Sequence, residues 1–208
     1  MQNATSKQEM AEGLRTLLDR AAITQVVQDW ALARDCGRWE RLRSAYTADG
    51  TMHTTWFVGS ADEFVARSIE SAKKGSRAQH FIGAASIELN GDRAVAETRM
   101  VLLLRAPLDG IEVDVTCYGR FYDLFLRDAG DWRIKKRVPI YEKDRLDPID
   151  PGAIVKLDAA ELASYPEGYR HLAYVQSRGG SQVTPGLPTP NSQALAQLYV
   201  DGAAWLAA

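Results

Sequence analysis

Four extended runs between residues 78 and 143 constrain the fold of this 208-residue chain most strongly. Apolar and polar residues alternate along them with a period of two, which is typical of strands with one buried face. The turn sequences NGD, PLDG and DAGD separate successive runs, and Gly and Asp favour tight reversals at such positions. We therefore predict an antiparallel meander of the runs AQHFIGAASIEL, RAVAETRMVLLLR, IEVDVTCYGRFYDLFLR and DWRIKKRVPIYEK.

The first third of the chain shows helical periodicity instead. SKQE at residues 6–9 has the form of a capping box, and apolar residues then recur at helical spacing as far as Gly37. RWERLRSAY predicts a shorter helix, GTMHTTWFVG a strand, and SADE at residues 60–63 the start of a third helix. Helices followed by a long sheet predict an α+β fold, in which a curved antiparallel sheet wraps around the N-terminal helices as a cone and leaves a pocket.

A proline-rich stretch, DRLDPIDPG, divides this region from the rest of the chain. It predicts one domain over residues 1–143 and a C-terminal extension over residues 144–208. Two weaker helical patterns lie in the extension, near residues 158–165 and 192–207. We expect the extension to act as a lid over the pocket or as an oligomerisation segment.

Composition excludes several classes of function. The 46% hydrophobic content favours a globular protein with one core. With 25 basic against 27 acidic residues there is no positive excess for binding nucleic acid. Apolar runs such as MVLLL are too short for a membrane helix, and the N-terminus lacks the pattern of a signal peptide, so a cytoplasmic location is expected. Cys36 and Cys117 are expected to be reduced thiols, and no nucleotide or zinc motif is present.

Two groups of residues are candidates for a site. His80 lies in the apolar run RAQHFIG, where it is either a packed core residue or a base that faces a cavity. On a later strand, alternation places Tyr118, Arg120 and Tyr122 on one face, opposite an apolar face. That polar face is either solvated or lines a pocket, where it would orient an aromatic or carbonyl-bearing ligand.

The order and spacing of DWALARDCGRWERLRSAYTADG, DEFV and RAQHFIG resemble the SnoaL-like group of the nuclear transport factor 2-like superfamily. The resemblance covers roughly residues 9 to 143, and scytalone dehydratase is a particularly similar member. It implies a cone-shaped α+β barrel with a deep apolar pocket. It also implies chemistry without a metal or an organic cofactor, because the superfamily includes dehydratases, a dehydrochlorinase, isomerases, polyketide cyclases and a diarylpropane lyase that expels formaldehyde.

Carried over by position, the resemblance makes Asp35 and His80 an acid-base pair. A carboxylate bound to one imidazole nitrogen fixes the tautomer, so that the other nitrogen can accept a proton. The sequence departs from scytalone dehydratase in three places: a second histidine is absent from RMVLLLR, Arg34 replaces a tyrosine, and Gly119 and Phe121 replace polar residues.

Other side chains are expected to bind the substrate. Arg120 is a third catalytic candidate, which could stabilise a developing oxyanion or phenolate, unless it forms a surface salt bridge. The aromatic candidates for substrate binding are Tyr46, Trp56, Tyr118 and Tyr122. Alternation places His53 and Trp56 on opposite faces, and Trp56 is the preferred pocket residue.

The function predicted from these residues is that of a cofactor-free lyase. It would eliminate water, formaldehyde or halide from a hydrophobic, aromatic or diarylpropane-type small molecule. An isomerase or cyclase and a non-catalytic ligand-binding module are the alternatives, since fold alone does not determine function. We expect a homo-oligomer, either a dimer or a trimer.

Overall fold

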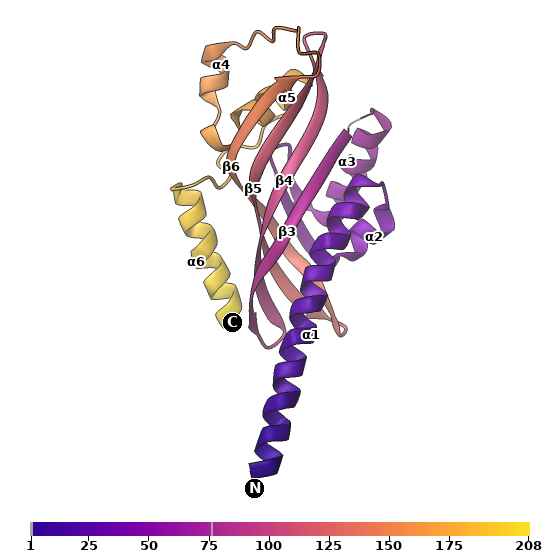
Figure 1. Ribbon diagram of the computed structural model, residues 1–208, viewed down its shortest axis with the longest axis vertical. Coiled ribbons are helices and arrows are strands. Elements are labelled where there is room, and N and C mark those ends of the chain that lie inside the picture. Colours follow the sequence, from indigo (N-terminus) through magenta and orange to yellow (C-terminus); the bar gives the residue numbers. More distant parts are fainter. Residues whose placement is uncertain (1, 76) are drawn as a thin grey trace.

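The computed structural model describes residues 2–75 and 77–208. Its helices and strands follow one another in the order predicted for an α+β protein (Figure 1). The helices are α1 (Gln2–Asp35), α2 (Trp39–Ser44), α3 (Ala61–Lys73), α4 (Ala159–Ser164), the 3-10 helix η1 (Glu167–Tyr169), α5 (Arg170–Arg178) and α6 (Gln193–Ala207). The strands are β1 (Tyr46–Thr54), β2 (Phe57–Ser60), β3 (Arg77–Asn90), β4 (Arg93–Leu108), β5 (Ile111–Asp128) and β6 (Asp131–Pro148).

The six strands form one sheet in the order β2-β1-β6-β5-β4-β3. The predicted meander of four long strands is confirmed, because β3, β4, β5 and β6 pair antiparallel with their sequence neighbours. Two of its turns have successive positive φ angles, 49° and 83° at Asp109 and Gly110 and 50° and 92° at Ala129 and Gly130, as tight hairpin turns require. The pairing of β1 with β6 is parallel, which strand alternation did not indicate.

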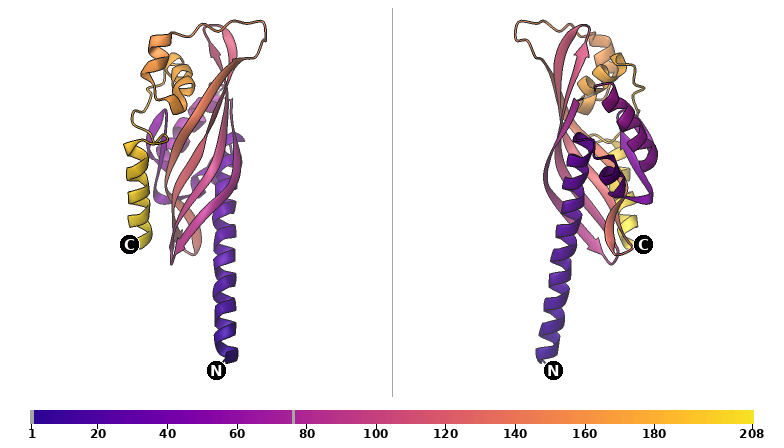
Figure 2. Two further views of the ribbon diagram at one scale, coloured as in Figure 1. Left: turned by 60° about the vertical axis from the view of Figure 1, so that its left-hand side comes forward. Right: turned by 90° about the vertical axis from the view of Figure 1, so that its right-hand side faces the viewer.

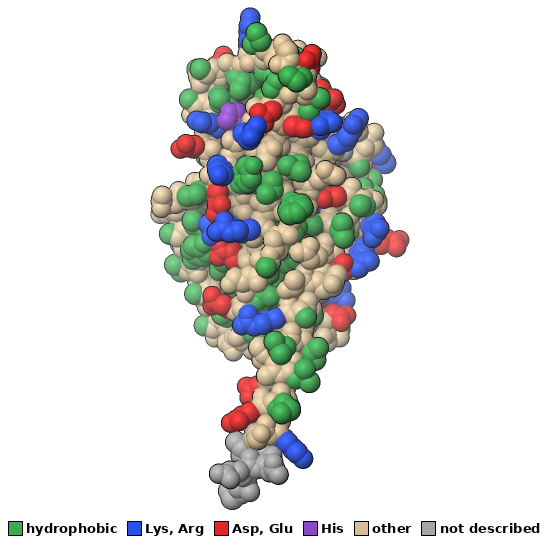
Figure 3. All heavy atoms as spheres, viewed as in Figure 1, with side chains coloured by type: hydrophobic (Ala, Val, Ile, Leu, Met, Phe, Trp, Pro, Cys, Tyr) green, Lys and Arg blue, Asp and Glu red, His purple; other side chains and the backbone are tan. Residues whose placement is uncertain are grey.

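The N-terminal helices cover one face of this curved, unclosed sheet (Figure 2). The predicted capping box at Ser60 and Glu63 is confirmed at the start of α3. The SKQE motif at residues 6–9 is not a helix start, because α1 already begins at Gln2. The first half of α1 projects past the end of the sheet (Figure 1). Along its described side chains, apolar residues such as Leu14 and Leu17 are exposed beside charged ones (Figure 3).

The core lies between the helices and the inner face of the sheet. It includes Trp30 of α1, Leu42 of α2, Phe64 of α3 and Phe121 of β5, all nearly inaccessible to solvent. These residues come from segments far apart in the sequence, so the position of each helix over the sheet depends on the same packed cluster.

The C-terminal extension is part of the same packed body. Strand β6 continues through the expected boundary at residues 143 and 144 to Pro148. Leu172 and Val175 of α5, a helix that the sequence pattern did not reveal, are buried in the main core. In contrast, α6 lies on the outer face of the sheet, opposite α1 (Figure 2), where Leu198 packs beside Tyr122. None of the helices in the described ranges is both long and apolar enough to cross a membrane.

Candidate active site

Asp35 and His80 form a hydrogen-bonded pair where the end of α1 lies against β3. The Asp35 Oδ1 atom lies 2.7 Å from His80 Nδ1. The other carboxylate oxygen, Oδ2, accepts a hydrogen bond of 2.6 Å from the backbone N–H of His80. Helix and strand are therefore joined at the site, and the orientation of the carboxylate is fixed by two contacts to one residue.

This geometry determines which nitrogen of the imidazole carries the proton. A carboxylate can only accept hydrogen bonds, so Nδ1 of His80 must be the donor. In a neutral imidazole the other nitrogen, Nε2, then has a free lone pair. Within residues 2–75 and 77–208, no hydrogen bond to Nε2 is present. The pair thus leaves one basic nitrogen available to a ligand.

Aromatic side chains hold the His80 ring in place. The Trp30 ring meets it edge to face, with centroids 5.3 Å apart, and the Phe121 ring lies 6.1 Å away. The side chains of His80 and Asp35 are only 11% and 13% exposed. An imidazole packed in this way has few alternative rotamers, which suits a preorganised base.

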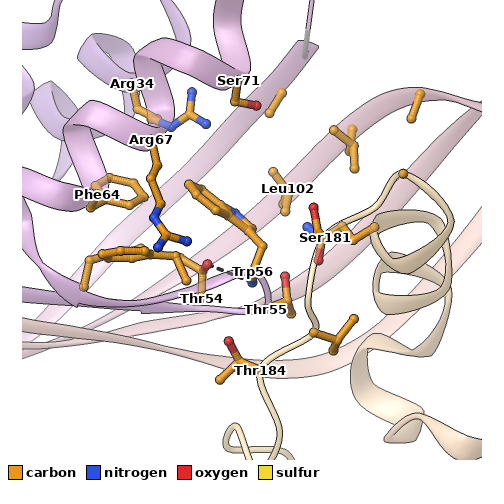
Figure 4. A pocket seen from close by; sticks show the side chains of 18 of the residues that line it. Arg34, Thr54, Thr55, Trp56, Phe64, Arg67, Ser71, Leu102, Ser181 and Thr184 are labelled. Atoms are coloured by element: carbon orange, nitrogen blue, oxygen red, sulfur yellow. Dashed lines mark hydrogen bonds between the residues drawn. The ribbon is translucent and has the colours of Figure 1, made fainter. Parts of the chain in front are cut away.

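His80 lies on the wall of a cavity of about 1320 Å³ between the helices, the sheet and the loop after α5. Residues of α1, α3, the β1–β2 hairpin and β4 form most of the wall, and residues 179–185 close the opposite side (Figure 4). A backbone hydrogen bond of 2.7 Å from Thr184 N–H to the Thr55 carbonyl ties that loop to the hairpin. The larger apolar and aromatic lining residues are Trp30, Met52, Trp56, Phe57, Phe64, Ile69, Met100, Leu102, Leu104, Phe121 and Tyr141.

A buried ion pair supports the aromatic wall from behind. Arg137 of β6 donates two hydrogen bonds of 2.7 Å to Asp123 of β5, and both side chains are inaccessible to solvent. The guanidinium of Arg137 lies over the rings of Trp30 and Phe121, 4.3 and 4.1 Å from their centroids. Sequence reasoning missed this pair, although alternation alone places Asp123 on the apolar face that includes Phe121. A single carboxylate on an otherwise apolar strand face could have indicated a buried ion pair.

Three expected pocket residues lie elsewhere. Tyr118, Arg120 and Tyr122 are on the outer face of β5, away from the cavity. Arg120 forms ion pairs with Glu97 and with Glu142, the latter at 2.8 Å, so it matches the alternative of a surface salt bridge. The reason is that the N-terminal helices and the cavity lie on the other face of the sheet. Alternation along a strand shows which residues share a face, but not which face the helices cover.

The remaining aromatic candidates differ in position. Trp56 lines the cavity, as expected, whereas Tyr46 is buried beneath it. The Tyr46 hydroxyl accepts a 2.8 Å hydrogen bond from Trp30 Nε1 and lies 3.3 Å from Met52 Sδ. Burial raises the pKa of Tyr46 well above its ordinary value. Tyr46 therefore holds the Trp30 indole in place, and it is not among the residues that line the cavity.

A second Asp-His pair lies outside the cavity. His171 Nδ1 is 2.8 Å from Asp144 Oδ1, and Asp144 Oδ2 accepts a hydrogen bond from the Leu172 N–H. Asp144 thus anchors the first turn of α5 to β6. His171 does not line the cavity, so the contacts of this pair serve to hold α5 against β6.

Comparison with known proteins agrees with this architecture. The sequence model of the SnoaL-like domain matches residues 15–138. The chain belongs to the SnoaL-like domain family. The family lies within the nuclear transport factor 2-like superfamily, as the motifs around Asp35 and His80 predicted.

Its relatives among curated proteins are fungal. An uncharacterised protein of Emericella nidulans is 34% identical over 169 residues, which cover 77% of this chain and 71% of that protein. Pea pathogenicity protein 2 of Fusarium vanettenii is 30% identical over 200 residues, which cover 91% of this chain and 86% of that protein.

Solved structures share the fold at lower identity. The type 2 form of the hexachlorocyclohexane dehydrochlorinase LinA gives a TM-score of 0.56 at 16% identity and covers 69% of this chain and 97% of its own. A scytalone dehydratase candidate from Novosphingobium aromaticivorans gives 0.55 at 17% identity, with coverage of 68% and 97%. At these identities the likeness shows the fold alone, with N-terminal helices on a curved, unclosed sheet.

Proposed function

We propose that this SnoaL-like protein is a cofactor-independent lyase in which His80 is the base and Asp35 its positioning partner. One observation carries the proposal. Both oxygens of Asp35 are bound to His80, which leaves the basic Nε2 atom available in a cavity walled by aromatic rings. Asp144 binds His171 in a similar manner, but His171 does not line the cavity. The position of His80 on the cavity wall is therefore what supports a role as a base.

The proposed reaction is an elimination. Nε2 takes a proton from a carbon of the substrate, and the C–H electron pair forms the new double bond as the bond to the leaving group breaks. Asp35 stabilises the resulting imidazolium, whose charge it opposes at 2.7 Å from Nδ1. The imidazolium then returns its proton to the departing oxygen, so a hydroxyl leaves as water. A halide leaves as an anion and takes no proton, so in that case the imidazolium releases its proton to solvent before the next turnover.

The cavity favours a hydrophobic, aromatic small molecule. Trp56 is partly accessible on the cavity wall, and an aromatic ring in that position stacks on planar ligands. Trp30 and Phe64 belong to the same wall but are almost fully packed against their neighbours. A cavity of about 1320 Å³ is larger than the pockets of roughly 300–1,000 Å³ that typically bind drug-sized ligands. There is room for a substrate with two aromatic rings, including a diarylpropane.

The test is an ultraviolet absorbance assay with β-hydroxylated aromatic and diarylpropane compounds and no added cofactor. His80→Gln and Asp35→Asn should each lower the rate by about 100- to 10,000-fold, the range that a general base contributes. His171→Gln is the matched control, because it alters the same kind of pair outside the cavity. A conjugated product formed equally fast by His80→Gln would refute the role of His80.

The product distinguishes the alternatives. Mass loss from the substrate identifies a lyase and its leaving group, whereas an unchanged mass with a shifted double bond identifies an isomerase. Ligand binding without turnover, undiminished in His80→Gln, would indicate a binding module instead.

A further inference from the structure

The charges on the cavity wall are strongly unequal. Arg34, Arg67, Lys73, Lys74 and Arg105 contribute to the wall, and of the described lining residues Glu70 is the one carboxylate. Glu70 is already bound to Lys73 at 2.8 Å, and Arg105 is bound to Asp114 outside the cavity. The protein as a whole has a net charge of -2, so this positive excess is a local property of the cavity.

Arg34 is the most informative of these cations. It precedes Asp35 at the end of α1 and reaches the cavity from the helical side, as does Arg67 of α3 (Figure 4). Burial lowers the pKa of the Arg34 guanidinium, but an arginine remains charged in a protein. Across residues 2–75 and 77–208, Arg34 has no ion pair and no side-chain hydrogen bond, whereas the buried Arg137 has a full partner in Asp123.

The neighbouring carboxylate of Asp35 forms no ion pair with Arg34, although its charge opposes part of the effect of burial on the pKa of the guanidinium. Both oxygens of Asp35 are bound to His80, and adjacent helical residues point about 100° apart and do not face each other. A half-buried guanidinium without a counter-ion is costly, because the charge loses hydration and gains no partner. Its five donors fit a carboxylate in a bidentate manner.

We infer that the ligand of this cavity is an aromatic carboxylate whose acid group binds Arg34 while its ring lies against Trp56. This inference rests on the proposed function only in taking the cavity as the substrate site. Arg67, whose guanidinium lies 5.2 Å from the centre of the Phe57 ring, and Lys74 add to the positive potential that attracts the anion. Because Arg34 and Asp35 are consecutive residues, the carboxylate is held close to the base.

The experiment compares two probes of nearly the same shape, of which only the first is charged: 3-hydroxy-3-phenylpropanoate and its amide. Binding is followed by quenching of the tryptophan fluorescence, since Trp30 and Trp56 line the cavity. Wild-type protein should bind the carboxylate roughly 10- to 150-fold more tightly than the amide, the range for a hydrogen bond to a charged group. Arg34→Gln should remove this preference, and Arg34→Lys should retain part of it.

Controls separate this inference from the proposed function. Arg38→Gln removes an exposed arginine near the same helix end and should leave the preference unchanged. His80→Gln should also keep the preference, because it leaves Arg34 in place. Preference for the carboxylate without any turnover would support the inference and count against the lyase. Equal binding of both probes, or of neither, by the wild-type protein would overturn the inference even if Arg34→Gln does not fold.

Discussion

Replacing Asp123 by Asn tests the idea that a buried charge supports the cavity wall. The change keeps the shape of the side chain but removes the negative charge that Arg137 meets at 2.7 Å. Both side chains are fully buried, so the guanidinium cannot be rehydrated without opening the core. One further donor of Arg137, Nη1, already has no partner among the described residues.

The expected cost follows from this burial. Removing one partner of a buried ion pair costs about 3–5 kcal/mol, because the other charge is left uncompensated. For a chain of this size each kcal/mol lowers the melting temperature by about 2–4 °C, so Asp123→Asn should lower it by about 6–20 °C. The cation-π contacts to Trp30 and Phe121 remain in place and oppose only part of this loss.

Urea unfolding followed by circular dichroism measures the free energy of unfolding directly. The matched variant is Asp123→Leu combined with Arg137→Met, which removes both charges. It should be more stable than Asp123→Asn, since apolar pairs of similar volume often replace buried ion pairs at little cost. A loss below about 1 kcal/mol in Asp123→Asn, or a double variant less stable than the single one, would refute the reasoning.

Two further predictions concern the outer face and the thiols. A Cβ atom at Gly202 would lie 1.9 Å from the Tyr122 hydroxyl, so Gly202→Ala should push α6 away from the sheet, and limited proteolysis should then cut near residues 186–192 faster than in the wild-type protein. Unchanged cleavage would mean that α6 can shift without detaching. Burial raises the pKa of Cys117 far above its ordinary value, whereas Cys36 is exposed, so a thiol reagent at pH 8 should label Cys36 within minutes and Cys117 only after denaturation. The control is Cys36→Ser, which should not be labelled in its native state. Rapid labelling of two thiols in the native wild-type protein, or of one in native Cys36→Ser, would contradict the burial of Cys117.

Local sequence patterns predicted most of the elements because alternation and turn chemistry act over a few residues. They predicted the four-stranded meander and the third helix with its Ser60 cap. They could not predict the parallel contact of β1 with β6, which depends on segments about 85 residues apart, as Met52 and Arg137 are. Helix α5 was missed because it is only nine residues long, which gives too few turns for a clear helical period in the sequence. Its apolar face can be recognised only from its packing against the core.

The Asp35–His80 pair could be predicted because the family motifs include both residues. The pocket residues on β5 could not, because only their shared strand face was known. Asp35 and His80 meet as the family pattern implied, although their catalytic role stays a prediction. For Arg120 and its tyrosine neighbours, period-two alternation identified a shared face but not the side on which the helices pack. Arg34 was noted only as a departure from the pattern, because its exposure to the cavity depends on the end of α1.

The loop over residues 179–185 has a consequence for how such a site can diversify. It forms the wall opposite the helices, and a backbone hydrogen bond from Thr184 to Thr55 ties it to the β1–β2 hairpin. The proposed base belongs to the first 80 residues of the chain, whereas this wall is encoded some hundred residues later. Substitutions, insertions or deletions in the loop can therefore reshape what the cavity admits while the histidine and its carboxylate keep their geometry. The part of the selectivity that depends on this loop can thus change without change to the reactive pair.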